Sequence, residues 1–259
     1  MFLLLFLLAT SKDDSTRYLT FKGKHKWLGG AVNPVDGSIF GIPSNADSVI
    51  RIFNNGNDED HVNVERIKLP ESMRVGRYKW LRGIIAHDHL YGIPAWSNAG
   101  VLKVPIVSSS SSRDCDATSV HVGTPTVLPL PNTKMVEGDL NVQGKENSLN
   151  DEQEMIRKDR WMWHGAALSE DETYIYCIPS NADRVMKVKV DPSVDPSGPH
   201  TEEIGPSVLG KNKWYGGIRG FDGCIYGAPY TARSILRIDP KTDKVTMLGD
   251  FGKLLICCI

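Results

Sequence analysis

Short apolar runs alternate with turn residues along the chain. The same pattern of apolar runs and turns is repeated four times. Each copy opens with a basic residue and a tryptophan, passes through a glycine and a short apolar run, and reaches a turn centred on aspartate. A second apolar run ends at a proline, and a polar turn leads to a third run with apolar residues at alternate positions. Alternation is typical of β-strands, and proline marks a strand end because it cannot donate to the ladder. The pattern predicts antiparallel strands joined by tight turns, and helical character only in the charged residues 150–157.

The four copies are aligned on their leading tryptophans, which are Trp27, Trp80, Trp161 and Trp214. A fourth, weaker strand is predicted to close each copy, at residues 64–69, 126–130, 207–209 and 245–248. Four antiparallel strands in about 50 residues match the size of one propeller blade. The sequence therefore predicts an all-β fold, a β-propeller of four antiparallel blades.

The propeller is predicted to occupy residues 23–259, with blades at 23–74, 75–157, 158–209 and 210–253. The second blade carries an insertion, residues 107–157, with five consecutive serines and mixed charges. Its composition predicts a long disordered loop that contains the blade's last strand near Val127. Residues 18–21 supply a surplus strand, which leaves one blade edge unpaired. We therefore expect either that two chains associate through blade edges or that the chain belongs to a family with more repeats.

Composition narrows the range of partners. The net charge is −1, with 41% apolar and 24% charged residues, so nothing favours nucleic acid or an anionic membrane. The five cysteines lack metal-site spacing, and we expect buried or free thiols. Residues 1–22 begin with an apolar run that resembles the core of a signal peptide but lacks a positive flank, and it is too short to cross a bilayer. The compartment is left open, with secretion as one alternative.

The stretch G-x-x-x-x-x-D-G-x-I-Y-G-I-P-x-N-A-x-x-V-L-x-I-D resembles the NHL-type and gluconolactonase-type propeller repeat. The resemblance covers about half of each unit and reaches all four units. It implies the propeller architecture, and it leaves function open because such propellers include lactonases, hydrolases and binding modules. The tandem K-W-x-G-G…D-G-x-I-Y-G-I-P units also resemble those of uncharacterised repeat proteins, which implies no activity.

Two recurring sets of side chains are candidate ligand contacts. A ring of aromatic side chains could stack on sugars beside a basic residue, although an indole in every blade also suits packing between sheets. The second set is one basic residue in each third strand, which either binds an acidic partner or lies near the rim with its stem over apolar neighbours. The first set is Trp27, Trp80, Trp161 and Trp214, and the second is Arg51, Lys103, Lys187 and Arg237.

Evidence for a metal or a catalytic motif is weak. The aspartates that recur in every copy suit turn chemistry better than a calcium site, which would take different residues from different blades. His87 and His89 are spaced like a metal-binding pair, but they fall in a turn and lack a third ligand. No nucleophile elbow, zincin or phosphate-loop motif occurs.

The sequence thus predicts a non-catalytic binding or assembly module for a protein or carbohydrate ligand, without cofactor, which contacts a loop face or the rim. The alternative is a gluconolactonase-like, metal-dependent hydrolase with calcium in a central channel.

Overall fold

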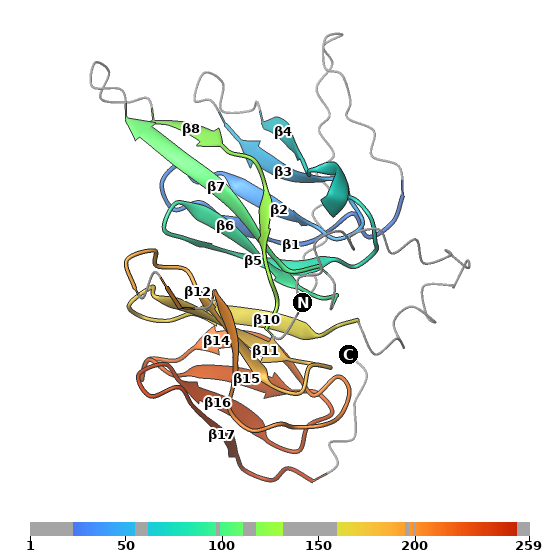
Figure 1. The fold of residues 1–259 in the computed structure, drawn as a ribbon, viewed down its shortest axis with the longest axis vertical. Helices are drawn as coiled ribbons and strands as arrows, with labels where there is room; N and C mark the ends of the chain where they lie inside the picture. The colour runs from blue at the N-terminus through green and yellow to red at the C-terminus, as the bar shows by residue number, and fades with distance from the viewer. Residues whose placement is uncertain are drawn as a thin grey trace.

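The chain folds into four antiparallel sheets that follow one another in sequence and in space (Figure 1). The computed structural model describes residues 23–54, 62–96, 99–110, 118–131, 160–194, 197–198 and 200–252. Within those ranges the only helix is a short 3-10 turn, Glu71–Met73. The prediction of an all-β fold with four antiparallel blades is confirmed.

Each blade pairs its strands in chain order. The first consists of β1 (Trp27–Val32), β2 (Ile39–Pro43), β3 (Ser48–Phe53) and β4 (Asn63–Lys68). The second has β5 (Trp80–Ala86), β6 (His89–Pro94) and β7 (Val101–Ser110), and both β8 (Thr118–Val122) and β9 (Thr126–Leu128) pair with β7. The third contains β10 (Trp163–Leu168), β11 (Tyr174–Pro179), β12 (Val185–Lys189) and β13 (Thr201–Ile204). The fourth contains β14 (Trp214–Arg219), β15 (Ile225–Pro229), β16 (Ile235–Asp239) and β17 (Lys244–Leu248).

Two strand predictions were wrong. The last strand of the third blade lies at Thr201–Ile204 and not at residues 207–209. Pro206 explains the difference, because it has no N–H with which to extend the ladder. The insertion does not begin as a disordered loop, since β7 continues to Ser110 and pairs with β8 as a hairpin. The strand near Val127 is β9, as predicted, and residues 132–159 lie outside the described residues.

The alignment of the third copy was also wrong. Trp163 lies opposite Pro179, as Trp27 lies opposite Pro43 and Trp80 opposite Pro94. The leading tryptophan of the third blade is therefore Trp163. The sequence R-W-M-W offers two tryptophans two residues apart, and only the pairing register decides between them.

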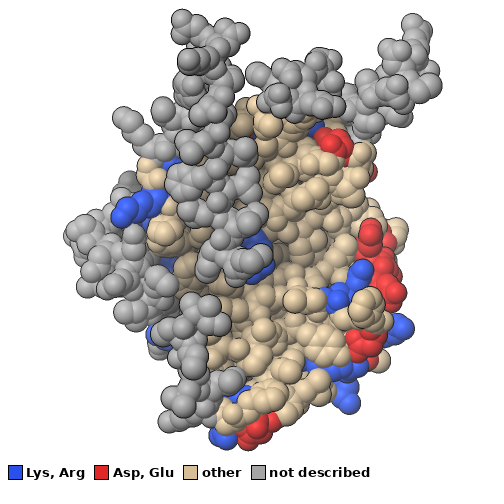
Figure 2. All heavy atoms as spheres, turned by 180° about the vertical axis from the view of Figure 1, so that it is seen from behind, with Lys and Arg blue, Asp and Glu red and all other residues tan. Residues whose placement is uncertain are grey.

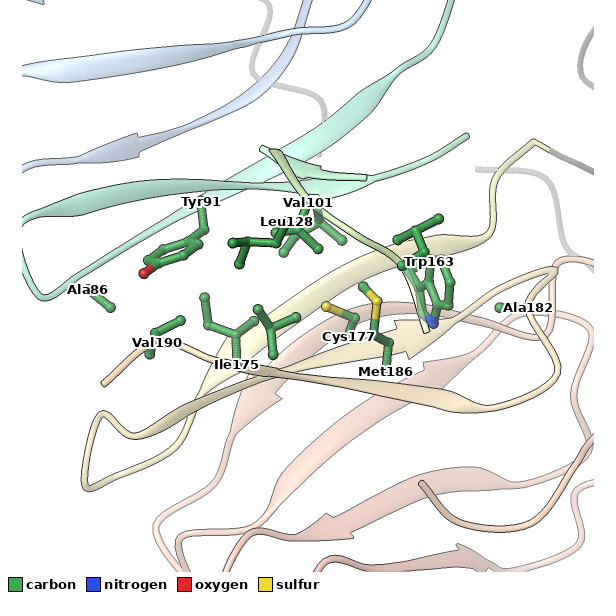
Figure 3. Packing of buried hydrophobic residues seen from close by; sticks show 13 residues of the cluster. Ala86, Tyr91, Val101, Leu128, Trp163, Ile175, Cys177, Ala182, Met186 and Val190 are labelled. Carbon is green, nitrogen blue, oxygen red and sulfur yellow. The ribbon is translucent and has the colours of Figure 1, made fainter. Parts of the chain in front are cut away.

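Apolar side chains from neighbouring blades form one core cluster at each junction. Between the second and third blades, Tyr91 and Leu128 face Ile175, Cys177 and Trp163 (Figure 3), and none of these is more than 9% exposed. The clusters at the first and third junctions have the same composition of branched residues and one indole. The blades are thus held by burial between sheets, which is the main stabilising term in such a stack.

The blades form an open row. Their first strands contact in sequence: β1 with β5, β5 with β10, and β10 with β14. Within the described ranges no comparable contact joins the first blade to the fourth, and Figure 1 shows them at opposite ends of the molecule. In the described part of the chain, each end blade therefore has one face that no neighbouring blade covers.

The surface seen in Figure 2 is mostly uncharged, and acidic and basic side chains gather toward one edge of it. Cys177 and Cys224 are buried free thiols, as expected, whereas the other cysteines and the N-terminal residues 1–22 lie outside the described residues. In the part of the chain that the structure describes, no helix has the length and apolar character needed to cross a membrane.

Candidate functional site

A continuous series of aromatic rings crosses all four blades at one end of their first strands. We call it the aromatic belt, and each ring contacts the next. The centroid distances are 5.5 Å for His25–Tyr78, 5.4 Å for Tyr78–Trp161, 5.7 Å for Trp161–His164, 3.9 Å for His164–Tyr215 and 4.5 Å for Tyr215–Tyr230. The last two pairs are stacked, with interplanar angles of 19° and 11°.

Two structural positions of the repeat supply most of the belt. Two residues before each first strand begins, one residue takes the left-handed conformation, with φ between 51° and 53°, at His25, Tyr78, Trp161 and Asn212. Three of these four residues are aromatic. The position after the leading tryptophan supplies His164 and Tyr215, and the turn after β15 supplies Tyr230. The chain reversal that starts each blade therefore also places a ring beside that of the neighbouring blade.

The belt is accessible at its ends and partly covered in the middle. His25 is exposed and Tyr230 is 38% exposed, whereas Tyr78 is buried. Burial lowers the pKa of His164 to about 4, and the charge of Arg82 acts in the same direction, so the imidazole is neutral at pH 7. Its Nδ1 and the Nε1 of Trp161 are buried without a hydrogen-bond partner among the described residues. Unpaired polar atoms of this kind are uncommon in native structures and suggest a site that takes a polar group.

Arg82 adds a positive charge beside the belt in an unusual backbone conformation. It is exposed, with φ 67°, at a position where the other three blades have glycine: Gly29, Gly165 and Gly216, with φ 81°, 131° and 70°. A side chain in the left-handed region costs about 1 kcal/mol or more, a cost that glycine avoids. Such strain is common at functional sites, so Arg82 is the second element of the candidate site.

The leading tryptophans lie at the blade junctions. Trp80 and Trp214 are 1% exposed and Trp163 is 3% exposed, whereas Trp27, at the open end of the row, is half-buried. Each indole N–H donates to a carbonyl within its own blade, Trp80 to Gly100 O at 2.9 Å and Trp214 to Ser234 O at 2.7 Å. Of the four tryptophans that the sequence offered as ligand contacts, Trp161 is the one that lies in the belt.

The basic residue before the tryptophan contacts the preceding blade. Nζ of Lys213 donates to Ser180 O and Ala182 O at 2.9 and 2.7 Å, and Nζ of Lys79 donates to Ala46 O at 3.1 Å. Burial lowers the pKa of both lysines to about 8. These inter-blade lysines satisfy buried carbonyls and are not available to hold an external anion.

The turn asparagines act across the same junctions. Oδ1 of Asn45 accepts from Tyr78 N, and Oδ1 of Asn181 accepts from Asn212 N, both at 2.7 Å. Each of these asparagine side chains therefore binds the blade that follows its own. Asn98 lies outside the described residues.

The basic residues of the third strands contact groups of their own blade or of the next one. Arg51 donates to Asp36 at 2.7 Å, and its guanidinium lies 4.2 Å from the centroid of the Phe53 ring. Lys187 contacts Asp243 of the following blade at 2.6 Å and Glu202 at 3.1 Å, and its Nζ lies over the Tyr174 ring. Arg237 lies 4.0 Å from Asp222 in the last blade, and Lys103 is half-buried in β7. These four side chains are spread over four separate sheets and do not converge on one site.

The aspartates of the hairpin turns bind their own turns. Oδ1 of Asp36, Asp171 and Asp222 accepts from the backbone N–H two residues later, at 3.0, 3.1 and 3.1 Å. Burial alone raises the pKa of Asp36, but hydrogen bonds from Ser38 and Arg51 outweigh it and hold the pKa below its usual value. The expectation that these residues serve turn chemistry is confirmed for these three blades.

His87 and His89 each have a ring nitrogen close to a backbone carbonyl oxygen. The first lies in the turn of the second blade, where His87 and Asp88 both have positive φ, and its Nε2 lies 2.8 Å from Glu172 O. Nδ1 of His89 lies 2.7 Å from His87 O. Within the described residues, no three His, Cys, Asp or Glu side chains come together as metal ligands.

An open depression of about 310 Å³ lies near the hairpin turns of the third and fourth blades. It is lined by Ser169, Glu170, Asp171, Gly223, Pro240 and Lys241.

Sequence reasoning missed the belt because its members have different identities in each blade. The leading tryptophan is constant and attracted attention, whereas the residue two positions before it is His25, Tyr78, Trp161 or Asn212. Once the third copy is aligned on Trp163, this one position is aromatic in three of the four copies. Arg82 could have been found in the same way, as the one exception to glycine.

No known protein family and no curated protein matches the sequence. Among solved structures, virginiamycin B lyase from Staphylococcus aureus is similar, with 13% identity over 86% of this chain and a TM-score of 0.52. A streptogramin B lyase is 15% identical over 86% of this chain, and a Lactobacillus plantarum protein is 12% identical over 86%, each with a TM-score of 0.50. The likeness is one of fold. The chain spans about half the length of these proteins, 55%, 54% and 55% respectively.

Proposed function

We propose that the chain is a non-catalytic binding module whose ligand lies along the aromatic belt, and that this ligand is an acidic carbohydrate. The observation that carries the proposal is Arg82, an exposed cation held in a left-handed conformation beside the belt. Ring faces carry negative partial charge and attract the C–H groups of sugars, while a guanidinium pairs with carboxylates.

The arrangement suits an extended ligand better than a compact one. The rings follow one another from His25 in the first blade to Tyr230 in the fourth. A ligand of several sugar units could therefore reach the exposed rings of His25 and Tyr230 at the two ends, whereas Tyr78 between them is buried. The unpaired Nε1 of Trp161 and Nδ1 of His164 offer a donor and a second polar atom near the middle of the belt. A hydrolase with a channel metal is not favoured by any cluster of ligating side chains among the described residues.

The proposal is tested by titration calorimetry with two probes of equal length, an oligogalacturonate hexamer and the neutral cellohexaose. We expect the acidic probe to bind and the neutral probe to bind more weakly. Arg82→Gly should abolish this preference while leaving thermal stability equal or higher, because glycine is the residue of the other three blades at that position. Trp161→Ala should weaken binding of both probes by about tenfold, which corresponds to one stacking contact.

Phe221→Ala is the matched control, because Phe221 is fully exposed on the turn before β15 and lies outside the belt. It should bind both probes like the parent protein. Binding that is unchanged in both Arg82→Gly and Trp161→Ala would contradict the assignment of the site. Failure of both oligosaccharides to bind would contradict the ligand class and would leave a protein ligand as the next one to test.

A further inference from the structure

The two ends of the open row are different, and each has the face that the other lacks. In every junction one blade contributes what we call its downstream face, the side that packs on the following blade. The following blade contributes its upstream face, the side that packs on the preceding one. Among the described residues, no other blade covers the upstream face of the first blade or the downstream face of the fourth blade.

The upstream face of the first blade has the apolar composition of a buried one. Cross-strand pairing places Val32, Ile39, Ile52 and Val64 in one row over all four strands. In the second blade, Leu90 and Val104 occupy the positions of Ile39 and Ile52, and both are 0% exposed because the first blade covers them. In the first blade, Val32 is 61% exposed, Ile39 39% and Val64 40%. A row of this kind on an exposed sheet is typical of an interaction surface.

The downstream face of the fourth blade corresponds to the faces that the first three blades bury in their junctions, but here it is more exposed. Tyr226 stands at the position of Phe40, Tyr91 and Tyr176, which are at most 1% exposed, but it is only half-buried. Ala228 stands at the position of Ile42, Ile93 and Ile178, which are 0% exposed, and it is exposed. The face also carries Arg237, whose Cα pairs with that of Tyr226.

The third junction shows what such a face binds. There, the hydroxyl of Tyr176 and Nζ of Lys187 both donate to Asp243 of the following blade, at 2.7 and 2.6 Å. Tyr226 and Arg237 repeat this pair of donors on the fourth blade, where both bind groups of their own blade. The Tyr226 hydroxyl donates to Asp222 at 2.7 Å, and the Arg237 guanidinium donates to Sγ of Cys224 at 2.8 Å and lies 4.0 Å from Asp222. The unpaired downstream face thus has the donors and the apolar positions that fit an upstream face.

We propose that two copies of this chain associate head to tail, with the downstream face of each fourth blade on the upstream face of the other copy's first blade. A second copy is the occupant that the structure favours, because it supplies both missing faces at once and closes the row with two identical contacts. Four blades span 54–55% of similar propellers, so two chains provide slightly more than one such ring. Eight blades lie within the usual range for closed propellers. A head-to-tail contact that closes in this way gives a discrete dimer and not a filament.

The oligomeric state is measured by light scattering coupled to size-exclusion chromatography on the full chain. The parent protein should have twice the chain mass of 28.7 kDa. Ile39→Lys disrupts only the upstream face of the first blade, and Ala228→Lys only the downstream face of the fourth, and each should give a monomer. Both residues are exposed within one chain, so each variant should still fold, with the far-ultraviolet circular dichroism spectrum of the parent protein. Leu209→Lys, at an exposed apolar residue on neither face, is the matched control and should remain a dimer.

Mixing the two monomeric variants provides the decisive measurement. Each variant retains one intact face, and the two intact faces are complementary, so an equimolar mixture should regain a species of dimer mass. A monomeric parent protein would overturn the proposal. A dimer that survives either lysine substitution, or a mixture that stays monomeric, would equally overturn head-to-tail association.

Discussion

The first blade and the later blades have the same sequence pattern but different environments. Trp27 and Trp80 begin equivalent strands and each donates its indole N–H to a carbonyl in its own blade. Trp80 is 1% exposed because the first blade covers it, whereas Trp27 is half-buried. The comparison shows that a repeat specifies the face of a blade, and that only a preceding blade makes this face part of the core.

The largest expected effect concerns these tryptophans. Trp80→Ala or Trp214→Ala should lower the free energy of unfolding by about 3–5 kcal/mol, because each leaves a cavity at a junction. Trp27→Ala should cost about half as much or less in a monomer, since less of its surface is buried. Urea denaturation of the three variants measures the difference. Equal losses at all three positions would show that the first blade is covered in solution.

The next effect lies at the position after the tryptophan, which is Leu28 in the first blade and His164 in the third. The pKa of His164 is about 4, below the unfolded value near 6.5, so below pH 6.5 the unfolded chain gains a proton that the folded chain does not. Stability should therefore fall by up to about 3 kcal/mol between pH 6.5 and pH 4 and be independent of this group above pH 6.5. His164→Phe keeps an aromatic ring against Tyr215 and should remove this part of the acid sensitivity. Identical pH profiles for the variant and the parent protein would show that His164 does not contribute to the acid sensitivity.

The inter-blade lysines predict an effect at alkaline pH. The pKa of Lys213 is about 8 in the folded protein, below 10.5, so the unfolded chain binds more protons between these values. Stability should rise from pH 8 to pH 10.5 by up to about 3 kcal/mol for this group, because loss of the charge removes the cost of burying it. Lys213→Met should lack this rise. Lys26→Met, at the equivalent position of the first blade, provides the comparison and should keep it.

The smallest effect comes from single methyl groups. Ile175→Val removes one from a fully buried position and should cost about 1 kcal/mol. Ile39→Val, at the equivalent position of the first blade, should cost only a few tenths in a monomer, because Ile39 is 39% exposed. In the proposed dimer, the loss of stability caused by Ile39→Val should approach that caused by Ile175→Val at high protein concentration. Melting temperatures measured over a range of concentrations distinguish the two cases.

The fold was largely predictable because the strand pattern is local. Asp-Gly turns, strand-ending prolines and alternating third strands are decided within about ten residues, and all four blades were found from them. The assignments that failed depend on pairing between distant residues. Trp161 and Trp163 are equivalent by composition, and only the register opposite Pro179 separates them. The candidate site was not predicted, because Arg82 and the belt come together through contacts between blades.

The direction of the junction contacts has a consequence for synthesis on the ribosome. Lys213 and the backbone N–H of Asn212 satisfy acceptors of the third blade, and Lys79 and Tyr78 do the same for the first. Each of these blades therefore emerges with unsatisfied carbonyls and an uncovered apolar face, and both are satisfied only when the next blade has been translated. A nascent chain arrested after one complete blade should expose that face to chaperones, whereas arrest after the next tryptophan strand should protect it.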